Sequence, residues 1–308
     1  MSNSPDISTK LGDLELKNPV MTASGTFGYG DEFASVIDVN KLGAIVVKGI
    51  SLKPMPGNPP PRTVETPAGM LNAIGLANIG IESFLIDKLP WLKTLDTKTI
   101  VNIYGHSIDE YGELASALKD VDGISAVEIN ISCPNVDKGG LVFGKDPEIS
   151  ARVTETVVKN TNKPVIVKLT PNVSDITILA TAVEQAGAHS LSLINTLTGM
   201  AIDIETRKPR LGNISGGLSG PAIRPVALHM VYQVVKAVKI PVIGIGGIMN
   251  AQDALEFLIA GASAVQVGTA NFINPGATLE IIDGIKDYCE RKNIKNIQEI
   301  VGSINIYR

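Results

Sequence analysis

Cysteine is what this chain most obviously lacks. It occurs only twice in 308 residues, as Cys133 and Cys289, far apart and without the paired spacing of a zinc ribbon or a disulfide framework. An iron–sulfur cluster held by thiolates usually needs four cysteines, so this chain alone cannot build one. We therefore expect no metal site on the chain and a reducing cytoplasm around it.

Basic blocks and long apolar runs are missing too. The formal net charge is −4, which leaves no electrostatic footprint for nucleic acid. The N-terminus lacks the basic start and apolar stretch of a signal peptide. The longest uncharged stretch, 261–279, contains Gln, Asn, Thr, Gly and Pro and so fails as a membrane span. We predict a soluble protein with neither a nucleic-acid nor a membrane partner.

Aromatic residues are few, at 4%, whereas the 30 glycines favour tight aliphatic packing around many turns. Short apolar runs recur along the chain, each followed by a turn and a longer amphipathic segment. The eight runs, expected to be strands, span 20–25, 44–50, 99–105, 126–132, 164–170, 190–196, 241–247 and 264–270. Helices are expected at 31–37, 107–119, 147–159, 174–186, 221–238, 250–260 and 275–290.

This alternation is typical of a parallel sheet covered by helices. Eight such units in this length favour one (β/α)8 TIM barrel, an α/β fold that would occupy residues 1–308 as a single domain. The opening "ISTKLGDLELKNP" resembles a β-hairpin that plugs the N-terminal end of the barrel. Two long connections, 51–82 and 197–220, follow strands, so we expect both at the catalytic face, as functional or disordered loops.

Polar residues stand near the ends of five of the predicted strands. Burying an unpaired amide costs roughly 2–7 kcal/mol, and burying an unpaired charge costs more. Singly, each asparagine could order a loop and each lysine could reach water. Together they predict one polar pocket at the mouth of the barrel, formed by Lys48, Asn102, Asn130, Lys168 and Asn195.

Two glycine-rich turns follow the seventh and eighth strands, "IGIGGI" at 243–248 and "VGTA" at 267–270. Backbone N–H groups in such turns bind phosphate, and these two loops are a frequent phosphate site in barrels, although glycine also simply permits tight turns. Phosphate, two lysines and several amides suit flavin mononucleotide (FMN), with Lys168 stabilising the negative charge that appears on reduction. Another phosphorylated ligand would fit the same residues.

Cys133 ends a strand in "EINISCPNVDKGG". Most free cysteines are small buried hydrophobes, which suits Cys289. Cys133 differs because Pro134 prevents regular structure from continuing and two glycines follow in the loop. A papain-like nucleophile would need a histidine partner, and the three histidines show no such arrangement. We therefore interpret Cys133 as a catalytic base.

The motifs resemble dihydroorotate dehydrogenases along essentially the whole chain. They are "NPVMTASGTFGYG" (18–30), "VVKGI" (46–50), "NAIGLAN" (72–78), "NISCPN" (130–135), "VKLTPN" (167–172), "INT" (194–196), "GGLSGPAIRP" (216–225) and "IGIGGI". Cysteine in the "NISCPN" loop, rather than serine, points away from the membrane-associated class. "SGTFGYG" and "NVDKGGLVFG" are similar to class 1B, the NAD-linked form, rather than to the fumarate-linked class 1A.

The resemblance implies oxidation of (S)-dihydroorotate to orotate with FMN, the redox step of de novo pyrimidine (UMP) biosynthesis. Cys133 would take the proton from C5 while hydride leaves C6 for flavin N5. The residues implied for FMN are Ser24, Lys48, Gly49, Asn102, Asn130, Lys168, Ile194, Gly220, Gly246, Gly247, Gly268 and Thr269. Those implied for the substrate are Lys48, Asn72, Ala73, Ile74, Gly75, Leu76, Asn130, Asn195 and Thr196, with Asn135 as an addition.

A partner chain is also implied. "GIGGIMNA" lacks the spacing of a dinucleotide fingerprint. The resemblance implies a second subunit that carries FAD and a [2Fe–2S] cluster and passes electrons to NAD⁺, in a heterotetramer of two catalytic and two electron-transfer chains. The alternatives are a class 1A enzyme, a related flavin barrel acting on another dihydropyrimidine, or a phosphate-binding barrel that senses or scaffolds without redox chemistry.

Overall fold

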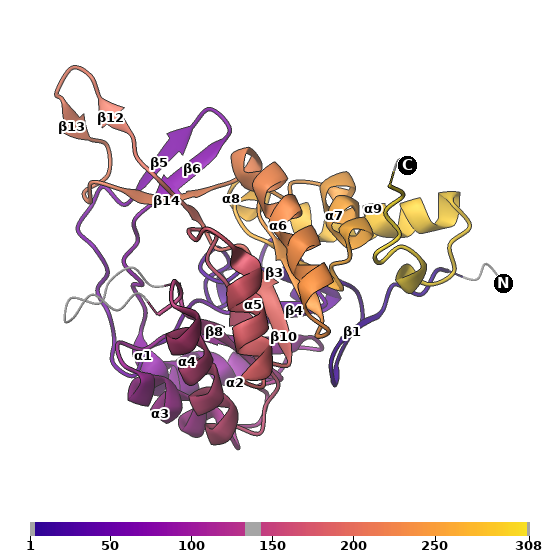
Figure 1. The fold of residues 1–308 in the computed structure, drawn as a ribbon, viewed down its shortest axis with the longest axis horizontal. Helices are drawn as coiled ribbons and strands as arrows, with labels where there is room; N and C mark the ends of the chain where they lie inside the picture. The colour runs from indigo at the N-terminus through magenta and orange to yellow at the C-terminus, as the bar shows by residue number, and fades with distance from the viewer. Residues whose placement is uncertain (1–3, 133–142, 307–308) are drawn as a thin grey trace.

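Eight parallel strands close into a barrel in the computed structural model, which describes residues 4–132 and 143–306 (Figure 1). The order around the barrel is β10-β15-β16-β3-β4-β7-β8-β9. The predicted fold is therefore confirmed. The barrel strands are β3 (Val20–Thr22), β4 (Ala44–Val46), β7 (Lys98–Ile103), β8 (Ala126–Asn130), β9 (Val165–Lys168), β10 (Ser190–Leu193), β15 (Val242–Ile245) and β16 (Ala264–Val267).

Helices surround the barrel and bury their apolar faces against its outer surface. Side chains at their N-termini accept the first free backbone N–H groups, as Ser107, Asp146, Asp175 and Asn250 do. The long helices fall where six of the seven were predicted: α3 (Ile108–Leu118), α4 (Pro147–Asn160), α5 (Ile176–Gln185), α6 (Arg224–Ala237), α7 (Ala251–Ala260) and α9 (Ala277–Arg291).

The helix predicted at 31–37 is wrong. Only a 3-10 turn, η1 (Asp31–Phe33), forms there, and no side chain caps its start. A helical segment that was not predicted covers 80–92 instead, as α1 (Gly80–Ser83), the π-helical η3 (Phe84–Lys88) and α2 (Leu89–Leu92). The remaining short helices are η2 (Val39–Lys41), η4 (Pro221–Ile223), α8 (Ala270–Ile273) and η5 (Ile297–Glu299).

The N-terminal hairpin closes the bottom of the barrel, as predicted. Its strands, β1 (Thr9–Leu11) and β2 (Leu14–Leu16), are antiparallel. Leucines from both strands, together with inward-facing residues of the barrel, form a buried apolar cluster. Its members are Leu11, Leu14, Leu16, Met21, Ala44, Val46, Ile100, Ala126, Ile166, Ile243 and Ala264.

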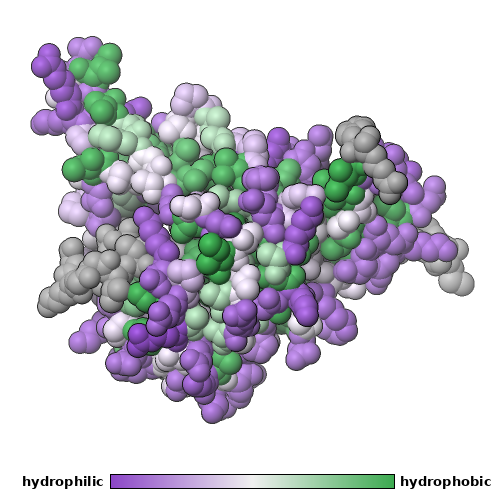
Figure 2. All heavy atoms as spheres, in the orientation of Figure 1, coloured by the Kyte–Doolittle hydropathy of each residue, from purple (hydrophilic) through white to green (hydrophobic). Residues whose placement is uncertain are grey.

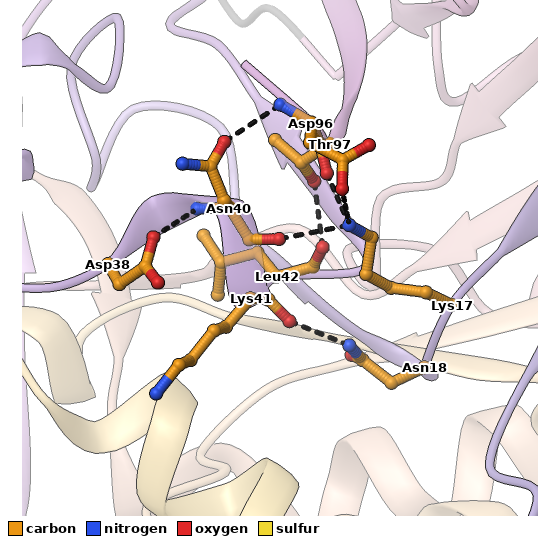
Figure 3. A network of polar contacts seen from close by, with 8 residues as sticks. All are labelled: Lys17, Asn18, Asp38, Asn40, Lys41, Leu42, Asp96 and Thr97. Carbon is orange, nitrogen blue, oxygen red and sulfur yellow. Dashed lines mark hydrogen bonds and ion pairs between the residues drawn. The ribbon is translucent and has the colours of Figure 1, made fainter.

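A polar network fastens the loops that enter β3, β4 and β7 (Figure 3). The Lys17 ammonium binds the backbone oxygen of Asn40 and the carboxylate of Asp96, each at 3.1 Å. The Asp96 N–H donates to the Asn40 side chain at 2.7 Å, and the Asn18 amide donates to the Lys41 carbonyl at 2.8 Å. These contacts hold together the N-terminal ends of three barrel strands.

The two long connections are not structureless, which corrects the sequence interpretation. They pair with each other in a four-stranded antiparallel sheet of order β11-β14-β6-β5. Its strands are β5 (Thr63–Thr66), β6 (Gly69–Asn72), β11 (Leu197–Gly199) and β14 (Gly216–Ser219). Val64, Leu71 and Leu211 form a separate small core there. Because the connections follow β4 and β10, they stand at the carboxyl ends of the barrel strands, as predicted.

A second hairpin projects from this sheet, formed by β12 (Ile202–Asp203) and β13 (Lys208–Pro209) (Figure 1). Ile202 and Ile204 are exposed on it, and hydrophobic atoms are visible at the projecting tip in Figure 2. Within the described residues, no helix combines the length and the apolar composition that crossing a bilayer requires.

Replacing Asn18 with alanine should lower the free energy of unfolding by about 2 kcal/mol. The change leaves the buried N–H of Val20 and the carbonyl of Lys41 without their side-chain partner. Urea titration of the purified chain measures the loss. Asn162→Ala is the matched control, because Asn162 donates to Asp120 at the surface, and it should cost under about 0.5 kcal/mol. Equal losses for the two variants would contradict a structural role for the network at the barrel base.

Candidate active site

The predicted site residues gather at the carboxyl ends of the barrel strands. Every barrel strand contributes, so residues far apart in sequence meet at one rim. At or just beyond the strand ends lie Ser24 (β3), Lys48 and Gly49 (β4), Asn102 (β7), Asn130 (β8), Lys168 (β9), Ile194, Asn195 and Thr196 (β10), Gly246 and Gly247 (β15), and Gly268 and Thr269 (β16).

Two lysines supply positive charge to this rim. Lys168 is only 5% exposed, and its Nζ lies 3.4 Å from the hydroxyl oxygen of Ser24. Among residues 4–132 and 143–306, no carboxylate forms an ion pair with it. Burial lowers the pKa of Lys48, an effect that Glu32 opposes. Ammonium groups buried in this way favour an anionic ligand, since a negative charge nearby offsets their desolvation.

Three amide side chains form a connected chain between β8 and the end of β10. The Asn195 amide donates to the side-chain oxygen of Asn130 at 3.3 Å, and its own oxygen accepts the N–H of Thr196 at 2.8 Å. Asn172, which the sequence interpretation missed, donates to the Thr196 carbonyl at 3.0 Å and accepts the N–H of Thr198 at 2.9 Å. These bonds fix the donors and acceptors that the rim presents.

Glycine is required at the turn after β15. Gly246 and Gly247 have φ values of 133° and 69°, which L side chains rarely adopt. A Cβ placed on Gly247 would lie 2.7 Å from the Arg224 Cβ and 2.8 Å from the Gly220 carbonyl oxygen. One placed on Gly220 would lie 2.7 Å from the Cα of Gly69. Three backbone segments therefore meet with no room for side chains, a cradle that suits the close approach of a phosphate.

These features fit FMN. The cradle suits its phosphate, and the buried ammonium of Lys168 and the amide rim suit a polar ring that gains negative charge. Thr269, which was also predicted to bind the cofactor, donates its hydroxyl to Ser219, the last residue of β14, at 2.8 Å. That bond ties the turn after β16 to the residue before Gly220.

The substrate segment is only partly joined to the rim. Asn72 donates to the Gly217 carbonyl at 3.3 Å, and Gly217 packs so closely on Thr196 that a Cβ there would collide with its side chain. Asn72 and Thr196 are thus linked through β14. The next residues are held within their own loop. Ala73 and Ile74 accept hydrogen bonds from Asn58, each at 3.0 Å; Gly75 packs against Asn58, and Leu76 accepts one from Asn78 at 2.8 Å.

Cys133 and Asn135 lie outside the described residues. Ser132, the last described residue before them, donates its hydroxyl to the Lys168 carbonyl at 3.4 Å. On the other side, a Cβ on Gly144 would lie 2.6 Å from the Ile131 carbonyl oxygen. Both flanks therefore lie beside the end of β8, and Ser132 also contacts Lys168.

Sequence reasoning also missed three polar residues inside the barrel: Glu128, Ser192 and Gln266 are all fully buried. A signal was available, since Glu128 is a charged residue at the centre of the apolar run "AVEIN". Its Oε2 accepts hydrogen bonds from Ser192 and Gln266, each at 2.8 Å.

Comparisons with known proteins agree with the motifs. A family model described as dihydroorotate dehydrogenase matches residues 6–289. A protein of Geotalea daltonii is 58% identical over 302 residues, which cover 98% of this chain and 99% of the relative. A Geobacter sp. (strain M21) protein is 57% identical with the same coverage, and one of Desulforamulus reducens is 58% identical over 98% and 99% of the two chains. All three are named dihydroorotate dehydrogenase B (NAD(+)), catalytic subunit.

Gly247→Ala should destabilise the chain by about 2 kcal/mol or more, because alanine must adopt a positive φ against the backbone of Gly220. Thermal and urea unfolding measure this. Gly268→Ala is the matched control in the neighbouring turn, where the nearest atom to an added Cβ is at 3.5 Å, and it should stay within about 0.5 kcal/mol of the parent. If both variants were equally stable, the turn would not require glycine.

Proposed function

The chain belongs to the dihydroorotate dehydrogenase family, and on that premise we propose that it is the catalytic subunit of an NAD-linked enzyme that oxidises (S)-dihydroorotate to orotate. The observation that carries the proposal is the sequence identity of 57–58%, over nearly the full chain, to proteins named as that subunit. The reaction is the redox step of pyrimidine biosynthesis. The buried, cationic rim of the barrel supports it.

We propose that FMN binds at the rim. When bound, it would supply a two-electron acceptor for hydride from C6 of the substrate. Gly220, Gly246, Gly247, Gly268 and Thr269 would surround its phosphate. The other predicted cofactor residues would line its ring, where the Lys168 ammonium offsets the negative charge of the reduced form.

The substrate is an anion, and Lys48 is the cation proposed to meet its carboxylate. Burial lowers the pKa of Lys48, so a carboxylate beside it should raise that pKa again and hold the lysine protonated. Asn130, Asn195 and Thr196 would donate to or accept from the pyrimidine ring. Asn72 to Leu76 would cover it from the long connection.

Cys133 is proposed as the general base that takes the proton from C5. General base catalysis is typically worth about 10²–10⁴-fold in rate. Ser132, the residue before Cys133, donates to the Lys168 carbonyl, which supports a base close to the proposed ring.

Electrons must then leave the chain. With two cysteines it cannot hold a thiolate-ligated cluster alone. The relatives' names specify a catalytic subunit, which supports a separate electron-transfer subunit. We propose that this partner carries FAD and [2Fe–2S] in a heterotetramer of two chains of each kind. A cytoplasmic setting and a single FMN-binding domain over residues 1–308 remain predictions.

The purified chain should be yellow, and it should bleach when dihydroorotate is added in the absence of oxygen. The loss of absorbance in the visible flavin bands measures the bleaching. NAD⁺ reduction by dihydroorotate should require the second polypeptide. A colourless chain that cannot be loaded with FMN would contradict the redox proposal. A bleached chain that fumarate reoxidises rapidly, without any partner, would instead assign it to class 1A.

Cys133→Ala should slow bleaching by about 10²–10⁴-fold while FMN and orotate still bind. Cys289→Ala is the matched control, because Cys289 lies on the buried face of α9 and its replacement should not affect the rate. An ordinary thiol has a pKa of about 8.5, so the rate in the parent should rise from neutral to alkaline pH as the thiolate forms. Equal rates in the parent and the Cys133 variant would require another base. So would a parent rate that does not change between neutral and alkaline pH.

A further inference from the structure

A buried carboxylate lies inside the barrel, below the proposed cofactor site. Glu128 is fully buried, and its two oxygens accept hydrogen bonds from three side chains on three other strands. The donors are Asn102 on β7 at 2.7 Å, and Ser192 on β10 and Gln266 on β16, each at 2.8 Å. Barrel interiors are usually filled by branched aliphatic residues, so this polar layer is unusual for the fold.

The order of residues along β8 places Glu128 below the rim. Glu128 pairs with Asn102, while Asn130, two residues further along β8, pairs with Lys168. Side chains two apart in a strand share a face, and their Cα atoms are separated by about 7 Å. On β8, Glu128 therefore lies one step below Asn130 and one step above Ala126, which belongs to the apolar cluster sealed by the hairpin.

Packing alone does not account for Glu128. Among the described residues it forms no ion pair, and a buried charge without a counterion is destabilising relative to an apolar side chain of similar volume. Its presence therefore points to a requirement other than stability.

The consequence for Asn102 is geometric. A carboxylate only accepts hydrogen bonds, so the Asn102 amide must turn its NH₂ towards Glu128 and its carbonyl oxygen away. That oxygen is buried and has no partner among the described residues. A Cβ placed on Gly49 would lie 2.8 Å from it, so it faces Gly49, a second residue of the proposed cofactor set.

We propose that Glu128 is a positioning residue that holds the Asn102 carbonyl towards bound FMN and sets a fixed negative charge beneath it. The proposal rests on the proposed function, since FMN is the ligand. The oxidised isoalloxazine has one ring N–H, on its pyrimidine side. If the Asn102 oxygen points towards the flavin, it can accept a hydrogen bond from that N–H. In the reverse orientation the Asn102 NH₂ would face the ring N–H, and two donors cannot bond to each other. The negative charge counteracts the Lys168 ammonium and so limits how strongly the site favours reduced flavin.

Two substitutions separate orientation from charge. Glu128→Gln keeps an oxygen for the Asn102 NH₂. Its new NH₂ group can donate to the Ser192 hydroxyl oxygen, and to the Gln266 oxygen once the Gln266 amide turns over. FMN affinity should then stay within about threefold of the parent, whereas the bound flavin becomes about tenfold easier to reduce at equilibrium. For a two-electron couple that is a rise of about 30 mV in midpoint potential.

Glu128→Met removes the acceptor as well as the charge. Asn102 is then free to turn, and FMN affinity should fall by about tenfold or more. If Glu128 acts through Asn102, the double variant Glu128→Met with Asn102→Ala should bind FMN within about threefold of Asn102→Ala alone. Ser192→Ala is the matched control for affinity, because it removes a donor to the same carboxylate and leaves the Asn102 contact in place.

The experiment loads the full-length chain with FMN and measures its dissociation constant by flavin fluorescence and its midpoint potential by dye equilibration. Thermal unfolding of each FMN-free variant checks the fold, and if Glu128→Met fails to fold, the potential of Glu128→Gln decides. An unchanged potential in Glu128→Gln, or additive affinity losses in the double variant, overturns the inference. If the variants give either of these results while the parent binds FMN and bleaches with dihydroorotate, only the role of Glu128 is overturned and the proposed function stands. If the parent binds no FMN, both the role of Glu128 and the proposed function are overturned.

Discussion

Closure of eight parallel strands into one barrel is the constraint on which the rest of the structure depends. The strands all run the same way and side chains alternate along them, so inward-facing residues stack in layers. The lowest layer is apolar and is sealed by the hairpin, the next contains Asn102, Glu128, Ser192 and Gln266, and the rim presents Asn130 and Lys168. Polarity therefore increases towards the carboxyl ends, where the connecting loops stand.

Local pattern was enough to predict the barrel and to place five polar side chains near the carboxyl ends of its strands. Each barrel strand is an apolar run that ends in a polar residue or a glycine turn, and a short repeating unit of this kind leaves few topologies open. The prediction failed where local signals were weak. At 31–37 the start is uncapped and only a 3-10 turn forms, whereas the helical segment at 80–92 follows directly on a stretch rich in proline and glycine.

Contacts between distant segments could not be read from the sequence in the same way. Asn72 pairs with Gly217 across 145 positions, and both strands contain glycine, which has a low preference for strands. Glu128 shows a similar limit. The sequence places a charge within an apolar run, but its three donors belong to strands that meet it only once the barrel has closed. What Cys133 contacts lies outside the described residues, so its role stays a prediction.

The two ends of the barrel divide stability and chemistry between them. At the base, the polar atoms of Asn18, Asn40 and Asp96 find partners, and leucines fill the interior. Towards the rim, a lysine lies buried without a carboxylate partner among the described residues, and an amide oxygen faces a glycine instead of a donor. Such groups destabilise a folded chain, yet they are already oriented for a ligand and need no reorganisation when it arrives. A well-satisfied base is what allows the rim to be built for binding, because a ligand that completes the rim's hydrogen bonds also adds its binding free energy to the stability of the fold.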